Sequence, residues 1–90
     1  MNPPWDARFE VLMREALRLL EPGDPLPPDL RTTDYGLDSL AMVELMLGIE
    51  ETYGISIPDD LVRPQLFSTP ETLWEVVDEL HDAQGSSAVG

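Results

Sequence analysis

The chain has 90 residues and a formal net charge of −13, from 18 acidic residues against five arginines and no lysine. This length supports one small domain, and the absence of cysteine excludes disulfides, Cys-ligated zinc and a thiol nucleophile of the protein itself. The negative charge disfavours nucleic acid and anionic membrane surfaces as partners and favours basic protein surfaces.

The amino-terminal residues and the apolar runs predict neither a signal peptide nor a membrane span. No apolar run approaches the roughly 18 residues that a membrane span needs, and Met1-Asn2-Pro3-Pro4 lacks the regions of a signal peptide. We expect a cytoplasmic monomer with a single domain over residues 1–84 and a disordered tail over 85–90.

The first predicted helix covers residues 6–20. On a wheel of about 100° per residue, its apolar residues share one face. They are Phe9, Leu12, Met13, Ala16, Leu19 and Leu20. Glu21-Pro22-Gly23 ends this helix, because proline cannot continue the hydrogen-bond ladder. The proline-rich loop that follows, to residue 35, should be ordered by burial of Leu26 and Leu30.

The second predicted helix begins at Asp38 or Ser39 and ends at Gly54. A short third helix is predicted over residues 59–65, with Asp59-Asp60 as its cap and Pro64 limiting its length. No internal repeat and no strand-like alternation is present. The predicted fold class is therefore all-α, with three main helices and a short third helix.

The last predicted helix begins near Ser68, and two starts are compatible with the sequence. Ser68 forms a capping box with Glu71, or Thr69 caps the helix and Pro70 takes its first position. Its apolar positions predict a buried stripe with two aromatic rings on the flank. The stripe is Leu73, Val76, Val77 and Leu80, and the flanking residues are Trp74 and His81.

The second helix has more apolar surface than one buried face requires. Its core face is predicted to hold Met42, Leu45, Met46, Ile49 and Tyr53. A second patch, Leu40, Val43 and Leu47, is surrounded by Glu44, Glu50 and Glu51. This patch is either a docking surface or the place that the short third helix covers. Residues 34–60 contain seven acids and no base, which favours docking of a basic partner.

Ser39 is the candidate functional residue, although local chemistry does not make it catalytic. A serine nucleophile needs a base, and the only histidine, His81, is far along the chain. The acids show no metal-binding spacing either, so we expect neither enzymatic activity nor a metal site. A helix start favours a negatively charged group such as a phosphodiester. For an isolated Asp-Ser pair, simple helix capping is nevertheless the stronger explanation.

Several motifs together change this balance. The run Asp34-Tyr35-Gly36-Leu37-Asp38-Ser39-Leu40, followed by Val43-Glu44-Leu45 and Ile55-Ser56-Ile57-Pro58, resembles the acyl carrier protein family. Residues 66–73 are similar to the start of the last helix in carrier domains of polyketide and peptide assembly lines. The resemblance extends from the first helix to about Leu80, and it implies a small four-helix bundle of acyl-carrier type. Tyr35, where the family often has leucine, is a small departure.

The resemblance also implies a function for these residues. A phosphopantetheinyl transferase would attach 4′-phosphopantetheine from coenzyme A to Ser39, and the terminal thiol would hold a substrate as a thioester. Asp38 would assist recognition by the transferase. Loading and downstream enzymes would contact Leu40, Val43, Glu44, Leu47, Glu50 and Glu51. An acyl chain would fold into a space lined by Leu45, Met46, Ile49 and Tyr53.

The resemblance favours a free-standing acyl carrier of polyketide or other secondary-metabolite biosynthesis, because peptidyl carriers more often have His or Asn before the serine. Two alternatives remain at this point. One is a free-standing peptidyl (aminoacyl) carrier of nonribosomal peptide synthesis. The other is an unmodified acidic helical adaptor that uses the same patch only to bind another protein.

Overall fold

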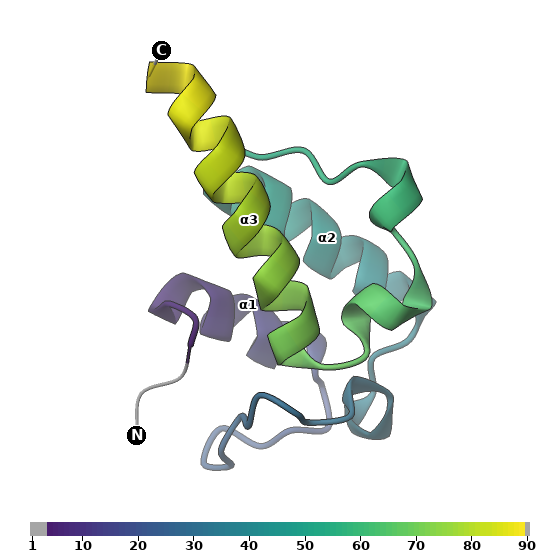
Figure 1. Cartoon of the computed structure of the whole chain (residues 1–90). Helices are drawn as coiled ribbons and strands as arrows, with labels where there is room; N and C mark the ends of the chain where they lie inside the picture. The colour runs from purple at the N-terminus through teal and green to yellow at the C-terminus, as the bar shows by residue number, and fades with distance from the viewer. Residues whose placement is uncertain (1–3, 90) are drawn as a thin grey trace.

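A computed structural model describes residues 4–89, with side chains described for residues 4–84. Within these residues the chain forms three α-helices and three short 3₁₀ turns, and no strand, which confirms the all-α class. In chain order they are α1 (Ala7–Ala16), η1 (Thr32–Tyr35), α2 (Ser39–Tyr53), η2 (Asp59–Leu61), η3 (Pro64–Phe67) and α3 (Pro70–Val89). Figure 1 shows α3 crossing in front of α1 and α2, with the linker from α1 to η1 passing beneath the start of α3.

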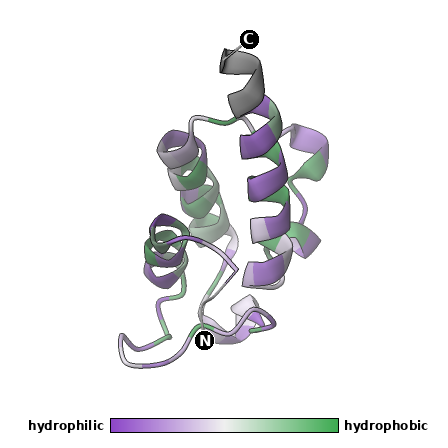
Figure 2. Cartoon of the chain, turned by 60° about the vertical axis from the view of Figure 1, so that its left-hand side comes forward, coloured by the Kyte–Doolittle hydropathy of each residue, from purple (hydrophilic) through white to green (hydrophobic). Residues whose placement is uncertain are grey.

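All three helices bury one face in a common core. Phe9 and Met13 of α1, Ile49 of α2, and Leu73 and Val77 of α3 are almost completely buried. Apolar and polar residues alternate along the helices in Figure 2, as expected when only one face of each helix is covered. Because each large apolar side chain contributes about 1.5–3 kcal/mol on burial, these contacts hold the short helices together.

Helix α1 is shorter than predicted, and the prediction that residues 17–20 are helical was wrong. The helix ends at Ala16, and the backbone of Leu17 leaves helical geometry with ψ 75°. The N–H of Leu19 then donates to the carbonyl of Tyr35 (3.1 Å) rather than to the preceding helical turn. As a consequence Leu17 is buried and Leu19, predicted to face the core, is 67% exposed.

The linker between α1 and α2 is ordered by burial, as predicted. Leu26 and Leu30 both lie in the core. The carbonyl of Pro28 accepts a hydrogen bond from the N–H of Glu71 (3.0 Å), which fixes the linker against the start of α3. The turn η1, which the sequence did not predict, adds a second attachment through Thr32, whose N–H donates to the carbonyl of Ser68 (3.1 Å).

Helix α2 begins and ends where predicted. It runs from Ser39 to Tyr53, and Gly54 closes it in the left-handed conformation with φ 63°. The N–H of Gly54 donates to the carbonyl of Glu50, which satisfies one of the last carbonyls of the helix. Glycine suits this position because it has no side chain to strain there.

The predicted third helix is replaced by two separate turns, η2 and η3. In an α-helix over residues 59–65, the nitrogen of Pro64 would have to donate to the carbonyl of Asp60, and proline has no N–H. Pro64 instead starts η3, and Pro58 precedes η2. The predicted capping by Asp59 and Asp60 was also wrong, since η2 has no side-chain cap.

Helix α3 starts by the second of the two predicted routes. The hydroxyl of Thr69 accepts from the N–H of Thr72 (3.2 Å), and Pro70 takes the first helical position. The hydroxyl of Ser68 donates instead to the carbonyl of Gln65 (2.8 Å), so the Ser68 capping box does not form. The helix is assigned as far as Val89, Gly90 lies outside the described residues, and the disordered tail over 85–90 stays a prediction.

Candidate functional site

Ser39 is the first residue of α2, and its side chain is exposed. The residue before it provides the helix cap: Asp38 has an extended backbone, and its Oδ1 accepts from the N–H of Ala41 (2.8 Å). The described residues make no hydrogen bond with the Ser39 hydroxyl. Capping therefore explains Asp38 and leaves Ser39 with an unengaged hydroxyl at the positive end of the helix dipole.

The loop before Ser39 is fixed against α1 and its C-terminal extension. Gly36 has φ 92°, a conformation that favours glycine, and a Cβ there would lie 3.2 Å from Cγ of Leu19. Leu37 is buried beneath the loop. On the outside, Nη2 of Arg18 contacts Oδ2 of Asp38 (3.0 Å) and the carbonyl of Gly36 (3.4 Å). The glycine, the buried leucine and the arginine contacts together set the position of Ser39.

Thr32 connects this loop to the other side of the site. Its side chain is buried, and its hydroxyl donates to the carbonyl of Phe67 and lies 3.2 Å from that of Ser68. The N–H of Leu37 in turn donates to the carbonyl of Thr32 (3.3 Å). The segment before Ser39 and the segment η3 are thus held in a fixed relation.

Two hollows flank the start of α2. The Ser39 hollow, about 160 Å³, lies between α2 and residues 62–67, and its lining is largely apolar. Its lining includes Ser39, Met42, Val43, Met46, Arg63 and Phe67. The α1–α2 groove, about 380 Å³, is acidic by comparison. Its lining includes Leu12, Glu15, Arg18, Asp38, Leu40 and Glu44.

The outer face of α2 is exposed, which rules out the alternative that the short third helix covers it. Leu40, Val43 and Leu47, which we call the α2 patch, are 69%, 49% and 54% exposed. Glu44 and Glu51 are exposed beside it. Glu50 differs from the other predicted contact residues, because it is half-buried and its Oε2 accepts from the N–H of Ile57 (2.8 Å).

The structure distributes the residues predicted to line an acyl-chain space over several environments. Met46 lines the Ser39 hollow, and Leu45 lines the α1–α2 groove. Ile49 and Tyr53 are buried in the core, where Tyr53 contacts the Trp74 ring at 6.2 Å between centroids. Of these four, only Met46 lines the hollow that Ser39 also lines.

The imidazole of His81 is not within reach of Ser39. The ring of His81 contacts Tyr53, with the centroids 5.5 Å apart, and Tyr53 is the last of the 15 residues of α2. A helix of this length separates its two ends by about 20 Å. His81 is therefore at the end of α2 opposite Ser39. Within the described residues no group of three or more His, Cys, Asp or Glu could hold a metal ion.

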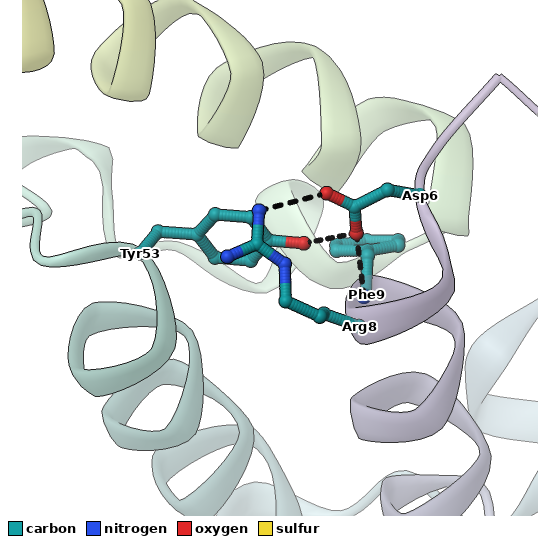
Figure 3. Close-up of polar contacts among 4 residues, drawn as sticks. All are labelled: Asp6, Arg8, Phe9 and Tyr53. Atoms are coloured by element: carbon teal, nitrogen blue, oxygen red, sulfur yellow. Dashed lines mark hydrogen bonds and ion pairs between the residues drawn. The ribbon is translucent and has the colours of Figure 1, made fainter.

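A polar cluster at that opposite end was not predicted from the sequence. Oδ1 of Asp6 accepts from the N–H of Phe9 (3.0 Å) and from the hydroxyl of Tyr53 (2.5 Å), while Arg8 pairs with Oδ2 (3.1 Å), as Figure 3 shows. Burial raises the pKa of Asp6, but the hydrogen bonds from Tyr53, Phe9 and Arg8 outweigh it and the net pKa is lowered. Burial and the bond to Asp6 raise the pKa of Tyr53.

This cluster connects two helices and is not part of the site at Ser39. Asp6 caps α1 and Tyr53 ends α2, so their bond joins the two helices far from Ser39. A helix-start aspartate was expected at Asp6, but only the tertiary packing brings Tyr53 to it.

None of the helices in the described part of the chain is long and apolar enough to cross a membrane.

Comparison with known proteins supplies independent information on the site. The sequence matches the family described as "Phosphopantetheine attachment site" over residues 8–77. It is 33% identical over 79 residues to an aminoacyl carrier protein of Agrobacterium fabrum, which covers 88% of this chain and 95% of that protein.

Two further relatives match a shorter part of the chain. The actinorhodin polyketide synthase acyl carrier protein of Streptomyces coelicolor is 43% identical over 49 residues, 54% of this chain and 55% of that protein. Aminoacyl carrier protein 1 of Bradyrhizobium diazoefficiens is 40% identical over 50 residues, 56% of each chain. The match thus spans little more than half of the length of these two relatives.

Proposed function

The chain belongs to the family of carrier proteins with a phosphopantetheine attachment site, and from this premise we propose that Ser39 is the attachment residue. The observation that supports the proposal is the division of roles at the start of α2. Asp38 alone caps the helix, and the exposed Ser39 hydroxyl has no other engagement among the described residues. A phosphodiester at this position would face the free N–H groups and the positive end of the helix dipole.

The family's cofactor is 4′-phosphopantetheine, a covalent group derived from coenzyme A, and the residues around Ser39 are compatible with it. When bound, it supplies a terminal thiol that carries an acyl group as a thioester, which a chain without cysteine cannot supply itself. The protein's own contribution is to present the arm: Asp38 and Gly36 fix the loop, and no side chain covers Ser39. The protein would then act with separate enzymes rather than as a catalyst.

The partner enzymes would approach the α2 patch. Its three exposed apolar residues lie beside the exposed acids Glu44 and Glu51, which suits an enzyme surface that is apolar with basic residues at its edge. Asp38 lies directly before the modified residue and is accessible to the transferase. Glu50 would contribute mainly by holding the segment after α2, because its carboxylate is bonded to Ile57.

The cargo is proposed to be an acyl group of polyketide or related secondary metabolism. The similarity to the actinorhodin carrier supports it, as does the aspartate before Ser39. An aminoacyl cargo is the second candidate, supported by the Agrobacterium relative that matches along nearly the whole chain. We place either form of the carrier in the cytoplasm as a monomer.

The attachment is tested by incubating the protein with coenzyme A and a broad-specificity phosphopantetheinyl transferase, followed by intact-mass measurement. Wild type should gain the mass of one phosphopantetheine, and Ser39→Ala should gain none. Ser56→Ala is the matched control, since Ser56 is another exposed serine and its variant should be modified like wild type. Absence of the mass gain in wild type, or its persistence in Ser39→Ala, would refute the proposal.

The adaptor alternative makes a different prediction about binding. An unmodified adaptor binds its partner equally well with Ser39→Ala, whereas a carrier is processed only in its modified form. Leu47→Arg weakens both kinds of complex, because it places a positive charge on the exposed apolar patch. Pull-down of synthase enzymes by the modified and unmodified protein separates the two: equal capture and equal processing would support the adaptor.

A further inference from the structure

The two hollows beside the start of α2 differ in charge. In the α1–α2 groove, Arg18 is paired with Asp38, so Glu15 and Glu44 give the groove its remaining negative charge. In the Ser39 hollow, Arg63 is the charged residue of the lining, and the lining residues other than Arg63 and Ser39 are apolar. An anion that starts at Ser39 therefore meets repulsion on one side of α2 and a cation on the other.

Arg63 is available for such an anion. Arg8, Arg14 and Arg18 form ion pairs with Asp6, Glu10 and Asp38. Arg63 is exposed and forms no ion pair within the described part of the chain. Arg31 is similarly exposed, but it lines a separate hollow with Leu20 and Tyr35. Among the arginines without a described ion pair, only Arg63 shares a hollow with Ser39.

The backbone that presents Arg63 is well anchored. Its carbonyl accepts from the N–H of Leu66 (2.9 Å), and Leu66 and Phe67 are both buried. Thr32 holds the carbonyl of Phe67, which links this turn to the segment before Ser39. Because the lining of the hollow is largely apolar and Arg63 is exposed, its aliphatic part suits the wall while its guanidinium can stay in contact with water.

We infer that Arg63 binds the phosphodiester of the phosphopantetheine arm on Ser39 and directs the arm into the Ser39 hollow rather than toward the α1–α2 groove. This inference rests on the proposed attachment to Ser39. Arginine suits a phosphate because its guanidinium presents several N–H donors in one plane. The start of α2 offers further N–H donors to a phosphate on Ser39.

The expected effect of Arg63 on the position of the arm follows from the solvent exposure of the ion pair between Arg63 and the phosphodiester. Solvent-exposed ion pairs shift an equilibrium by about two- to fivefold, and salt weakens them. Arg63 should therefore bias the position of the arm without holding it permanently. Release of the arm to partner enzymes then remains easy, as carriage of a substrate requires.

The test uses the full-length protein carrying the arm, with ¹³C and ¹⁵N in the protein only. Nuclear Overhauser contacts from the unlabelled arm to Val62 and Met46 are compared in wild type, Arg63→Gln, Arg63→Lys and Arg31→Gln. We expect these contacts to fall at least about twofold in Arg63→Gln and to be retained in Arg31→Gln. Arg63→Lys, which keeps the charge, should retain most of them, and the phosphorus resonance should shift only in Arg63→Gln.

Three results would overturn the inference. They are equal contacts in wild type and Arg63→Gln, an equal loss in Arg31→Gln, and arm contacts to Ala16 and Leu12 of the α1–α2 groove in wild type. Intact mass establishes the modification of every variant first. Failure to modify wild type would therefore refute the attachment itself, whereas modified protein without an Arg63 effect would refute only this inference.

Discussion

Asp6 caps the start of α1 and Asp38 caps the start of α2, but the two side chains differ in their other contacts. Asp38 bonds the N–H of Ala41 and pairs on the surface with Arg18, where both side chains are more than half exposed. Such a pair contributes little free energy, so Asp38 acts chiefly as the cap of α2, and the Ser39 hydroxyl takes no part in capping. Asp6 bonds Phe9 and also Tyr53, so that it joins the start of α1 to the end of α2.

The pH dependence of stability should report the bonds of Asp6. Its pKa is lowered in the folded protein, so its stabilisation is present above the ordinary pKa of 3.8 and is lost as the pH falls through the lower folded value. Asp6→Asn keeps a capping side chain but does not titrate there. The difference in unfolding free energy between wild type and Asp6→Asn should therefore shrink between about pH 5 and pH 2.

Urea denaturation at several pH values measures this difference, and comparison of the two proteins cancels the titration of the other acids. The change should not exceed about 1 kcal/mol, because the Asp6 side chain is 41% exposed and solvent screens its charge. A difference that stays constant with pH would contradict a stabilising role for the ionised carboxylate.

At the level of elements, local signals predicted some boundaries and tertiary contacts decided others. The start and end of α2 follow from Asp38 and Gly54, whose effects act within one turn of the helix. The end of α1 does not follow from its own residues, since it depends on the bond from Leu19 to Tyr35. The division of the third helix could have been predicted, because Pro64 cannot donate to Asp60.

The same distinction applies to the candidate site. The position of Ser39 at the start of α2 and the second apolar face of that helix could be predicted, because motif and periodicity both lie within one segment. The bond of Glu50 to Ile57 and the place of Arg63 in the hollow with Ser39 could not, since both depend on how residues 55–67 fold back against α2. Thr32 was missed for the same reason, as its partners lie about 35 residues away.

Thr32 allows a direct test of how the segment that ends in η3 is held against the loop before Ser39. Thr32→Val keeps the shape of the side chain but removes the hydroxyl, which leaves the carbonyl of Phe67 in η3 without this partner. The loss should lower the unfolding free energy by about 1–3 kcal/mol. Thr33→Val is the matched control, because Thr33 is exposed and its variant should be close to wild type. Equal urea midpoints for the two variants would show that the hydroxyl does not hold η3.

Over the whole molecule, the two ends of α2 differ in their contacts and in the charge around them. The cluster of Asp6, Tyr53 and the aromatic rings stabilises one end of α2. The other end presents Ser39 between an acidic groove and a hollow with an arginine. The net charge of −13 disfavours compactness through self-repulsion, and it suits the basic partners that we propose for the exposed α2 patch. The contacts at the Tyr53 end thus stabilise α2 at a distance from Ser39, which stays exposed.

Site-resolved mass spectrometry of the protein isolated from its host tests the central claim most directly. The account predicts a phosphopantetheine on Ser39, and in part of the molecules an additional acyl or aminoacyl mass that hydroxylamine removes as expected for a thioester. Ser39 unmodified in every molecule, or the group on another serine such as Ser56 or Ser68, would contradict it.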